Sequence, residues 1–192
     1  MAAKSHKKRI IILALISTSL IAILGFGFYT FFNAKDEPVT TTTVVAKKET
    51  PTETVAGIIG SQDNLKDFTK SLKEVALFSS LDGQTPYTVF SFNNEAFKQA
   101  PQEVEEIFKN DNKADSKKDI INYHIVSGNV EPSAMNEGQK LKTMNGSEIV
   151  VKKENQNIYL VDMKGNSVKV EKAGIPAKNG SVYIISGILL PQ

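Results

Sequence analysis

The sequence contains no cysteine among its 192 residues. This absence excludes a disulfide framework, thiolate zinc sites, a cysteine nucleophile and the acylated cysteine of a lipoprotein anchor. Arginine is also scarce, because after Ser61 the chain has 16 lysines, 17 acidic residues and no arginine. Such a balanced mixture lacks the clustered positive charge that binding to a phosphate backbone requires. We therefore expect a domain held together by packing alone, and no nucleic-acid partner.

Histidine is nearly absent too, since His6 and His124 are the only two in the chain. With one histidine beyond the basic N-terminus and no cysteine, a transition-metal site would depend on carboxylates alone. No nucleophile, base and orienting group can be assembled. The acidic cluster of Glu103, Glu105 and Glu106 has the residue type of a glycosidase pair, but its place in the first turn of a predicted helix favours a solvated face. We expect no metal, no cofactor and no enzymatic activity.

Residues 10–32 carry no charge and are dominated by isoleucine, leucine and phenylalanine. As a helix this run would be about 35 Å long, which exceeds the roughly 30 Å hydrocarbon core of a bilayer. Four basic residues within positions 1–9 precede it, and mixed charges follow it. The positive-inside rule therefore predicts a cytoplasmic tail over residues 1–9 and a signal-anchor transmembrane helix over 10–32. This single-pass arrangement leaves the C-terminal domain outside the cytoplasm, at the cell membrane.

A cleaved signal peptide is the alternative for the same segment. It shares the basic start, but its apolar run is usually only about 7 to 15 residues long. The one weak cleavage position lies near Asn33 and Ala34, after the bulky Phe31 and Phe32. Cleavage there would make the protein secreted.

Residues 33–60 are rich in threonine, include Pro38 and Pro51, and contain no aromatic residue. Such a segment buries too little apolar surface to repay ordering. We predict a flexible tether over this range, with a reach of about 30 Å for a chain of its length.

Residues 61–192 carry the patterns of one folded domain. Leu65, Phe68 and Leu72 recur at helical spacing. A β-branched and aromatic run at 87–92 indicates a buried strand, after which Asn93 can cap a short helix. Further short helices are predicted at 102–108 and from Ser116. The later pattern is one of strands separated by Asn-Gly and Lys-Gly-Asn turns, at 141–144, 149–153, 158–163, 167–171 and 182–190. Helices followed by a meander define an α+β class.

Three segments in order resemble conserved blocks of fasciclin domains: YTVFSFNNEAF at 87–97, INYHIV at 121–126 and NGSVYIISGILLP at 179–191. The intervening LKTMNGS at 141–147 is similar to the hairpin of that family. The resemblance covers residues 61–192. It implies a fasciclin-like wedge, an antiparallel β-sandwich with short helices on its N-terminal side. It also implies a non-catalytic module for binding or cell adhesion.

The sequence departs from the family pattern at three places. Positions 91–93 read Ser-Phe-Asn where Ala-Pro-Thr is usual, which keeps a capping residue. Tyr183 and Ser186 stand at the positions of the usual histidine and aspartate. Gly174 and Ile175 align with the Asp-Ile pair through which animal relatives bind integrins, so integrin-type binding is not supported.

Tyr123 and His124 match the Tyr-His motif that the family resemblance implicates in adhesive contacts, and they are the candidate partner-binding residues. The alternative is structural, with a half-buried His124 ring bonded to main chain and its neighbours Ile120 and Ile125 packed. The sequences Asn-Gly-Ser at 145–147 and 179–181 are formal glycosylation acceptors, although both are also typical of tight turns, which we favour.

Together these patterns predict a membrane-anchored, outward-facing binding or cell-adhesion module. Its partner would be an extracellular protein or polysaccharide, and the membrane itself would hold residues 10–32. The alternative function is a carrier or sensor of a small apolar ligand, held in a cleft between the helices and the sheet.

Overall fold

The computed structural model describes residues 50–192. Its α-helices are α1 Val55–Ser61, α2 Lys66–Glu74, α3 Asn94–Lys98, α4 Gln102–Lys109 and α5 Ala114–Tyr123. Its strands are β1 Tyr87–Phe92, β2 Ile125–Ser127, β3 Lys140–Lys142, β4 Glu148–Glu154, β5 Asn157–Val161, β6 Ser167–Ala177 and β7 Gly180–Ile185. The predicted cytoplasmic tail and membrane helix lie outside the described residues. Between residues 50 and 192, none of the helices has the length and apolar character needed to cross a bilayer.

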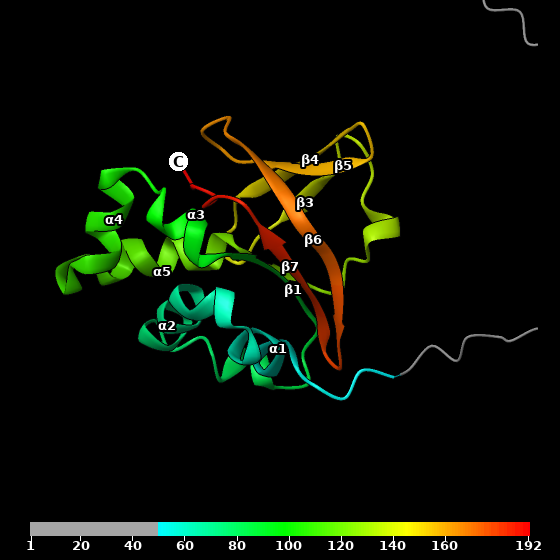
Figure 1. The fold of residues 1–192 in the computed structure, drawn as a ribbon, viewed down its shortest axis with the longest axis horizontal. Helices are drawn as coiled ribbons and strands as arrows, with labels where there is room; N and C mark the ends of the chain where they lie inside the picture. The colour runs from blue at the N-terminus through cyan, green and yellow to red at the C-terminus, as the bar shows by residue number, and fades with distance from the viewer. Residues whose placement is uncertain (1–49) are drawn as a thin grey trace, which may run out of the picture. The chain divides into compact units, whose positions relative to one another are not determined.

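The strands form one mixed sheet in the order β2-β1-β7-β6-β5-β4-β3 (Figure 1). Neighbouring strands are antiparallel except for β1 and β7, which run parallel. A bridge between Val126 and Thr143 brings the two edges of the sheet together, so the sheet curls towards closure. The predicted α+β class and wedge are confirmed. The predicted sandwich takes the form of a single curled sheet whose two halves face each other.

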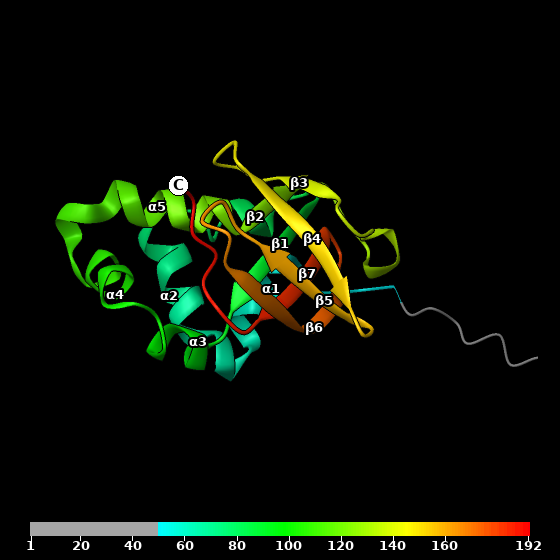
Figure 2. The same ribbon diagram turned by 90° about the horizontal axis from the view of Figure 1, so that it is seen from above.

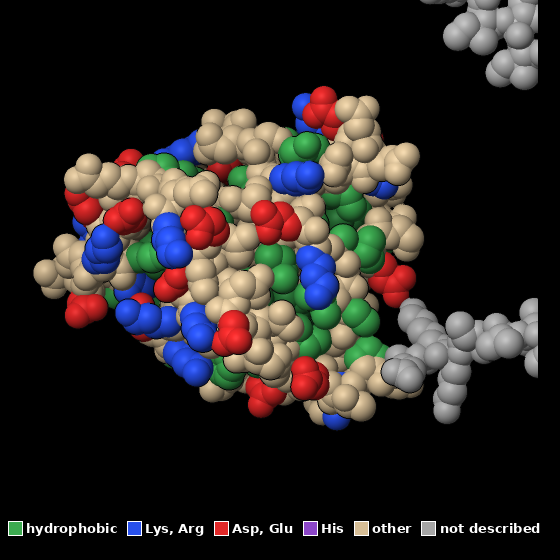
Figure 3. Space-filling view, viewed as in Figure 1, with side chains coloured by type: hydrophobic (Ala, Val, Ile, Leu, Met, Phe, Trp, Pro, Cys, Tyr) green, Lys and Arg blue, Asp and Glu red, His purple; other side chains and the backbone are tan. Residues whose placement is uncertain are grey.

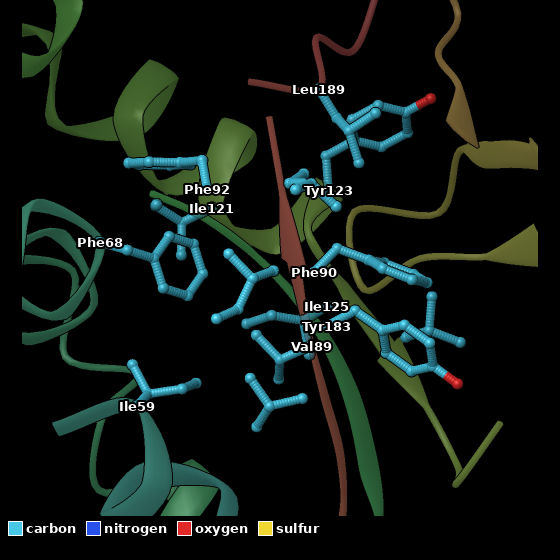
Figure 4. Packing of buried hydrophobic residues seen from close by; sticks show 14 of the residues in the cluster. Ile59, Phe68, Val89, Phe90, Phe92, Ile121, Tyr123, Ile125, Tyr183 and Leu189 are labelled. Atoms are coloured by element: carbon cyan, nitrogen blue, oxygen red, sulfur yellow. The ribbon is translucent and has the colours of Figure 1, made fainter. Parts of the chain in front are cut away.

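The parallel pair β1 and β7 lies at the centre of the domain and is buried on both faces. Five of the six residues in β1 and all six in β7 are buried. In Figure 4, Ile59 and Phe68 approach this pair from the helices, while Phe90 and Tyr183 lie on its other side. Because both faces need apolar side chains, these segments have nearly continuous apolar sequences rather than alternating ones.

Strand β6 joins the two halves of the sheet. Its first residues, Ser167 to Lys169, pair with β5, and the stretch from Val170 to Ala177 pairs with β7. Two register irregularities fall between Val170 and Ile175, where the strand bends. The bend lets β3, β4 and β5 cover the face of β1 and β7 opposite the helices (Figure 2). The prediction placed the end of this strand at residue 171, six residues too early.

Helix α1 corrects the predicted boundary of the tether. Thr54 caps this helix by accepting the Gly57 N–H at 3.1 Å. Val55 and Ile59 have no exposed surface, and the helix packs against β1 and β7. Residues 55–60 therefore belong to the domain and not to a flexible tether. The prediction failed because it took the absence of aromatic residues as absence of a core, whereas small aliphatic side chains fill this position.

Asn179 fixes the corner at which α1, β1 and β7 meet. Its Oδ1 accepts the Val55 N–H at 2.8 Å, and its Nδ2 donates to the Leu81 carbonyl at 2.9 Å. Gly180 has φ +142°, and a Cβ there would lie 1.8 Å from the carbonyl oxygen of Tyr87. The predicted Asn-Gly turn is confirmed, and only glycine fits its second position. Since Asn179 is buried, it is not accessible as a glycosylation acceptor in the folded domain.

The first turn of helix α2 is capped by a side chain from a distant segment. Asp63 pairs with Lys66 at 2.9 Å, and this lysine lowers the pKa of the Asp63 carboxyl. The free N–H of Asp67 instead donates to the Asn94 side chain at 3.2 Å. Asn93 caps α3 through its side-chain oxygen, as predicted. One cap is thus local, and the other comes from a residue 27 positions away.

Removal of α1 is expected to destabilise the domain. A chain that begins at Gln62 lacks the buried Val55 and Ile59, and full burial of each such side chain is worth about 1.5 to 3 kcal/mol. We expect it to lose at least about 3 kcal/mol of unfolding free energy relative to a chain that begins at Pro51. Urea unfolding midpoints measure the difference. A chain that begins at residue 40 serves as the control and should match the Pro51 chain. Equal midpoints for all three would show that α1 adds nothing.

Candidate functional site: the Tyr-His motif and the C-terminal strap

The His124 side chain lies at the C-terminal end of α5 and has no exposed surface. Its Nδ1 is 2.8 Å from the Ile120 carbonyl oxygen, and its Nε2 accepts the Leu189 N–H at 3.1 Å. Because the Leu189 amide can only donate, Nε2 must carry the lone pair. The ring is therefore the neutral tautomer with its proton on Nδ1.

Aromatic rings surround the imidazole. The ring centroids of Phe68 and Phe92 lie 6.0 and 5.4 Å from that of His124. Burial among them lowers the pKa of His124 from 6.5 to about 4, against the opposing effects of the Ile120 carbonyl and the Asp162 charge. The imidazole is accordingly uncharged at neutral pH.

Tyr123 is also completely buried. Its hydroxyl donates to the Glu148 carbonyl at 2.8 Å and accepts the Met163 N–H at 3.1 Å. Burial raises the pKa of the Tyr123 phenol to about 12, although the Met163 N–H opposes the shift. The hydroxyl thus connects α5 to β4 and to the turn after β5.

The two candidate partner-binding residues, Tyr123 and His124, have no exposed surface. Both side chains lie inside the domain, and their polar atoms are bonded to main chain of other segments. The structural alternative describes His124 better, with full burial where half burial was expected.

Asp162 is a polar anchor that the sequence analysis missed. It is 5% exposed, and its carboxylate accepts N–H groups from the main chain of Lys164, the main chain and side chain of Asn166, and the main chain of Leu190. The Leu190 bond is 3.1 Å long. The only local signal was a turn-forming Lys-Gly-Asn, which says nothing about a contact with Leu190.

His124 and Asp162 hold two consecutive amides of the segment 186–192, which we call the C-terminal strap. Ile188 and Leu189 of the strap are buried, and both belong to the same hydrophobic core cluster as Tyr123 (Figure 4). The end of the strap forms one wall of an open cleft of about 390 Å³ against α4 and α5. The cleft is lined by Glu103, Val104, Ile107, Asp115, Ser116, Asp119, Ile120, Lys164, Leu190, Pro191 and Gln192.

The predicted acidic cluster divides between two environments. Glu105 forms an ion pair with Lys109 within α4, and Glu106 forms one with Lys113 in the turn that follows this helix. Glu103 lies at the cleft instead. Residues 50–192 contain no group of three or more side chains arranged to hold a metal ion.

The departures from the family pattern have structural roles. The Tyr183 hydroxyl donates to the Val130 carbonyl at 2.7 Å, and burial raises the pKa of this phenol. Gly174 has φ +60°, and a Cβ there would lie 2.3 Å from Cγ of Pro132. An aspartate at this position would therefore require Pro132 to move.

A curled mixed sheet with helices over one face and a buried Tyr-His motif defines a fasciclin-type domain. The model of the fasciclin domain family matches residues 63–191, and the chain belongs to this family. A solved structure, the FAS1 domain pair from the insect cell adhesion molecule Fasciclin I, contains the same fold, with a TM-score of 0.65 and 19% identity. That match covers 73% of this chain and 51% of the insect chain.

Similar sequences occur in bacteria and animals. Protein sll1483 of Synechocystis is 26% identical over 88% of this chain and 93% of its own length. Immunogenic protein MPB70 of Mycobacterium bovis is 30% identical, and the match covers 74% of this chain and 62% of MPB70. Transforming growth factor-beta-induced protein ig-h3 of Oryctolagus cuniculus is 26% identical, but the match spans only 20% of that protein.

The buried His124 should make stability depend on pH. Its pKa is lower in the folded chain than the ordinary 6.5, so stability is complete above about pH 6.5 and falls as the pH approaches 4. Between pH 7 and pH 5 we expect this group to remove about 2 kcal/mol. The variant His124→Gln cannot take up the proton, and carboxylates act equally in both proteins. Urea midpoints should therefore fall further in the wild type, and parallel curves would contradict the assignment.

Proposed function

We propose that this protein is a single-pass membrane protein whose fasciclin domain faces away from the cytoplasm and binds an extracellular protein or polysaccharide. Membership of the fasciclin family over the folded domain carries the proposal, together with the adhesion role in the name of Fasciclin I. The charge-free run at residues 10–32 and the basic residues before it supply the anchor and its orientation. The protein acts by binding and does not catalyse a reaction.

The chemistry of the domain supports binding over catalysis. His124 is the only histidine after His6, and both of its ring nitrogens are engaged within the domain. The His124 ring is therefore not available as a general acid or general base for a substrate. A general base must reach the proton that it abstracts, which a ring without exposed surface does not do.

The surface of the domain has no strong field of one sign. Lysine and acidic side chains alternate over the face drawn in Figure 3, and several form ion pairs within one helix turn, such as Lys98 with Glu95. A surface of this kind gives little long-range steering of a charged partner. Recognition should depend on shape and on apolar contacts.

Two exposed methionines link the buried motif to the surface. Met144 and Met163 are the large hydrophobic side chains that are exposed in the described part of the chain, at 39% and 42%. The Met163 N–H donates to the Tyr123 hydroxyl, and the Met144 N–H donates to the Ile125 carbonyl at 2.8 Å. The Tyr-His segment thus positions both residues without itself reaching a partner. Methionine adapts well to an irregular apolar surface.

The alternative of a small apolar ligand receives no support from a specific observation. The space between helices and sheet is filled by packed rings, including Phe92 and Phe97, whose centroids are 5.9 Å apart. The cleft beside the strap is open, and charged side chains such as Glu103 and Lys164 line it.

Substitution at the two methionines tests the proposed contact. Cells that display the full chain should attach to surfaces coated with extracellular material. Met144→Gln and Met163→Gln should each weaken attachment about fivefold, which corresponds to about 1 kcal/mol of contact energy. Folding stability should stay within about 0.5 kcal/mol, as for other surface changes.

Ala173→Gln, at an exposed position on β6, is the matched control and should leave attachment unchanged. His124→Gln should lower attachment only as far as it lowers the folded fraction. Full attachment by both methionine variants would reject this contact surface. Attachment equal to that of cells displaying only residues 1–49 would reject the binding function itself.

The anchor has a separate test. The full chain should fractionate with membranes, and its intact mass should include residues 1–32, because the apolar run is long enough to span. Protease added outside the cell should remove the domain. A mature protein that begins near Lys35 would instead be secreted.

A further inference from the structure

We propose that the C-terminal strap, residues 186–192, is an acid-released latch: protonation of His124 detaches the strap while the central strands stay paired. The inference concerns regulation of the domain and does not rest on the proposed adhesion function. It follows from the way in which the strap is held.

The strap has few main-chain contacts of its own. The Ser186 N–H donates to the Lys169 carbonyl at 3.0 Å, at the end of the β6–β7 ladder. Beyond Ser186 no strand pairing continues within the described structure. The Leu189 N–H goes to His124 Nε2 and the Leu190 N–H goes to Asp162 Oδ2, each at 3.1 Å. Beyond Ser186, the side chains of His124 and Asp162 therefore accept the main-chain hydrogen bonds that hold the strap.

Protonation of the imidazole acts on one side of the ring only. An imidazolium carries N–H groups on both nitrogens. Nδ1 would go on donating to the Ile120 carbonyl, as it does in the neutral ring. Nε2 would become a donor that faces the Leu189 N–H, so the bond is lost and two like dipoles oppose each other. Protonation therefore removes the bond to the strap, whereas the bond to α5 is kept.

The charged and titratable groups around the ring do not prevent this. Asp162, from the turn after β5, is the charge that favours the imidazolium. Tyr123 on α5 keeps its proton, because burial raises the pKa of its phenol. Helix α2 and strand β1 present Phe68 and Phe92, which do not titrate. Asp162 therefore assists protonation, and the buried position of the ring is what opposes it.

Release would change the surface at this end of the domain. Ile188 and Leu189 are buried only while the strap is closed, and they pack in the main core cluster. The wall formed by Leu190, Pro191 and Gln192 would also leave the cleft beside α4 and α5. Acid would thus expose apolar surface that is covered at neutral pH.

The size of the effect follows from the two protonation states. The closed strap holds the pKa of His124 at about 4, and an opened strap returns the ring towards its ordinary 6.5. Linkage then limits the rise of the opening equilibrium between pH 7.5 and pH 5 to about 30-fold, which is reached if the ring returns fully to 6.5.

Hydrogen exchange measured by mass spectrometry on the full chain in lipid nanodiscs tests the latch. After correction for intrinsic exchange rates, peptides that end at Gln192 should lose protection from pH 7.5 to pH 5, by a factor of up to about 30. Peptides from β1 and β7 should keep theirs. In His124→Gln, which can still donate to Ile120 and accept from Leu189, the strap should be equally protected at both pH values.

The variant Asp162→Asn distinguishes the role of His124, which takes up the proton, from that of Asp162, which accepts the Leu190 N–H. This variant keeps His124, so its strap should be more open at both pH values while the pH dependence remains. Three outcomes would overturn the proposal: strap protection that is the same at both pH values in the wild type, an equal loss in His124→Gln, or a loss in step with β1 and β7, which would mean global unfolding.

Discussion

The parallel pairing of β1 with β7 is the constraint on which the rest of the domain depends. It joins the first strand of the domain to the last, in register from Tyr87 beside Gly180 to Phe92 beside Ile185. Closing so long a loop costs chain entropy, which the burial of both faces of the pair offsets. The close approach of the chains at Gly180 and the bonds of Asn179 fix the corner where the pair begins. Helices and the curled half of the sheet then have opposite faces to cover.

The Tyr-His motif belongs to the same interior. Tyr123 and His124 each bond main chain that arrives from a distant part of the sequence, at β4, at the turn after β5 and at the strap. Fully satisfied polar groups in a core of low dielectric favour one arrangement over its competitors. The motif thus specifies the architecture near Met144 and Met163, and under the proposed function its influence on a partner is indirect. This separation explains how a buried pair can matter to a surface that it does not form.

Two buried titratable groups, His124 and Asp162, hold the C-terminal strap. Most of the ion pairs on the helices are exposed, such as Lys66 with Asp63 and Lys98 with Glu95, and such pairs contribute little to stability. The pair of Lys117 with Glu74, at 2.9 Å between α5 and α2, differs because the lysine is buried. His124 and Asp162 hold adjacent residues of the strap. Acid therefore acts at one end of the domain rather than over its whole surface. A domain with this property would present different surfaces in neutral and acidic surroundings.

Local chemistry in the sequence by itself determined the α+β class, the buried strand at 87–92, the Asn93 cap and the Asn-Gly turns, because periodicity and turn preference depend on neighbours along the chain. The three-block resemblance also indicated the family. Only the tertiary structure decided that α1 Val55–Ser61 is part of the core, that β2 Ile125–Ser127 is a strand, and that β1 and β7 run parallel. It alone brought Asp162 to Leu190 and closed the aromatic cluster over His124. These features result from contacts between segments far apart in sequence, and no local pattern encodes which distant segment a strand or a carboxylate will meet.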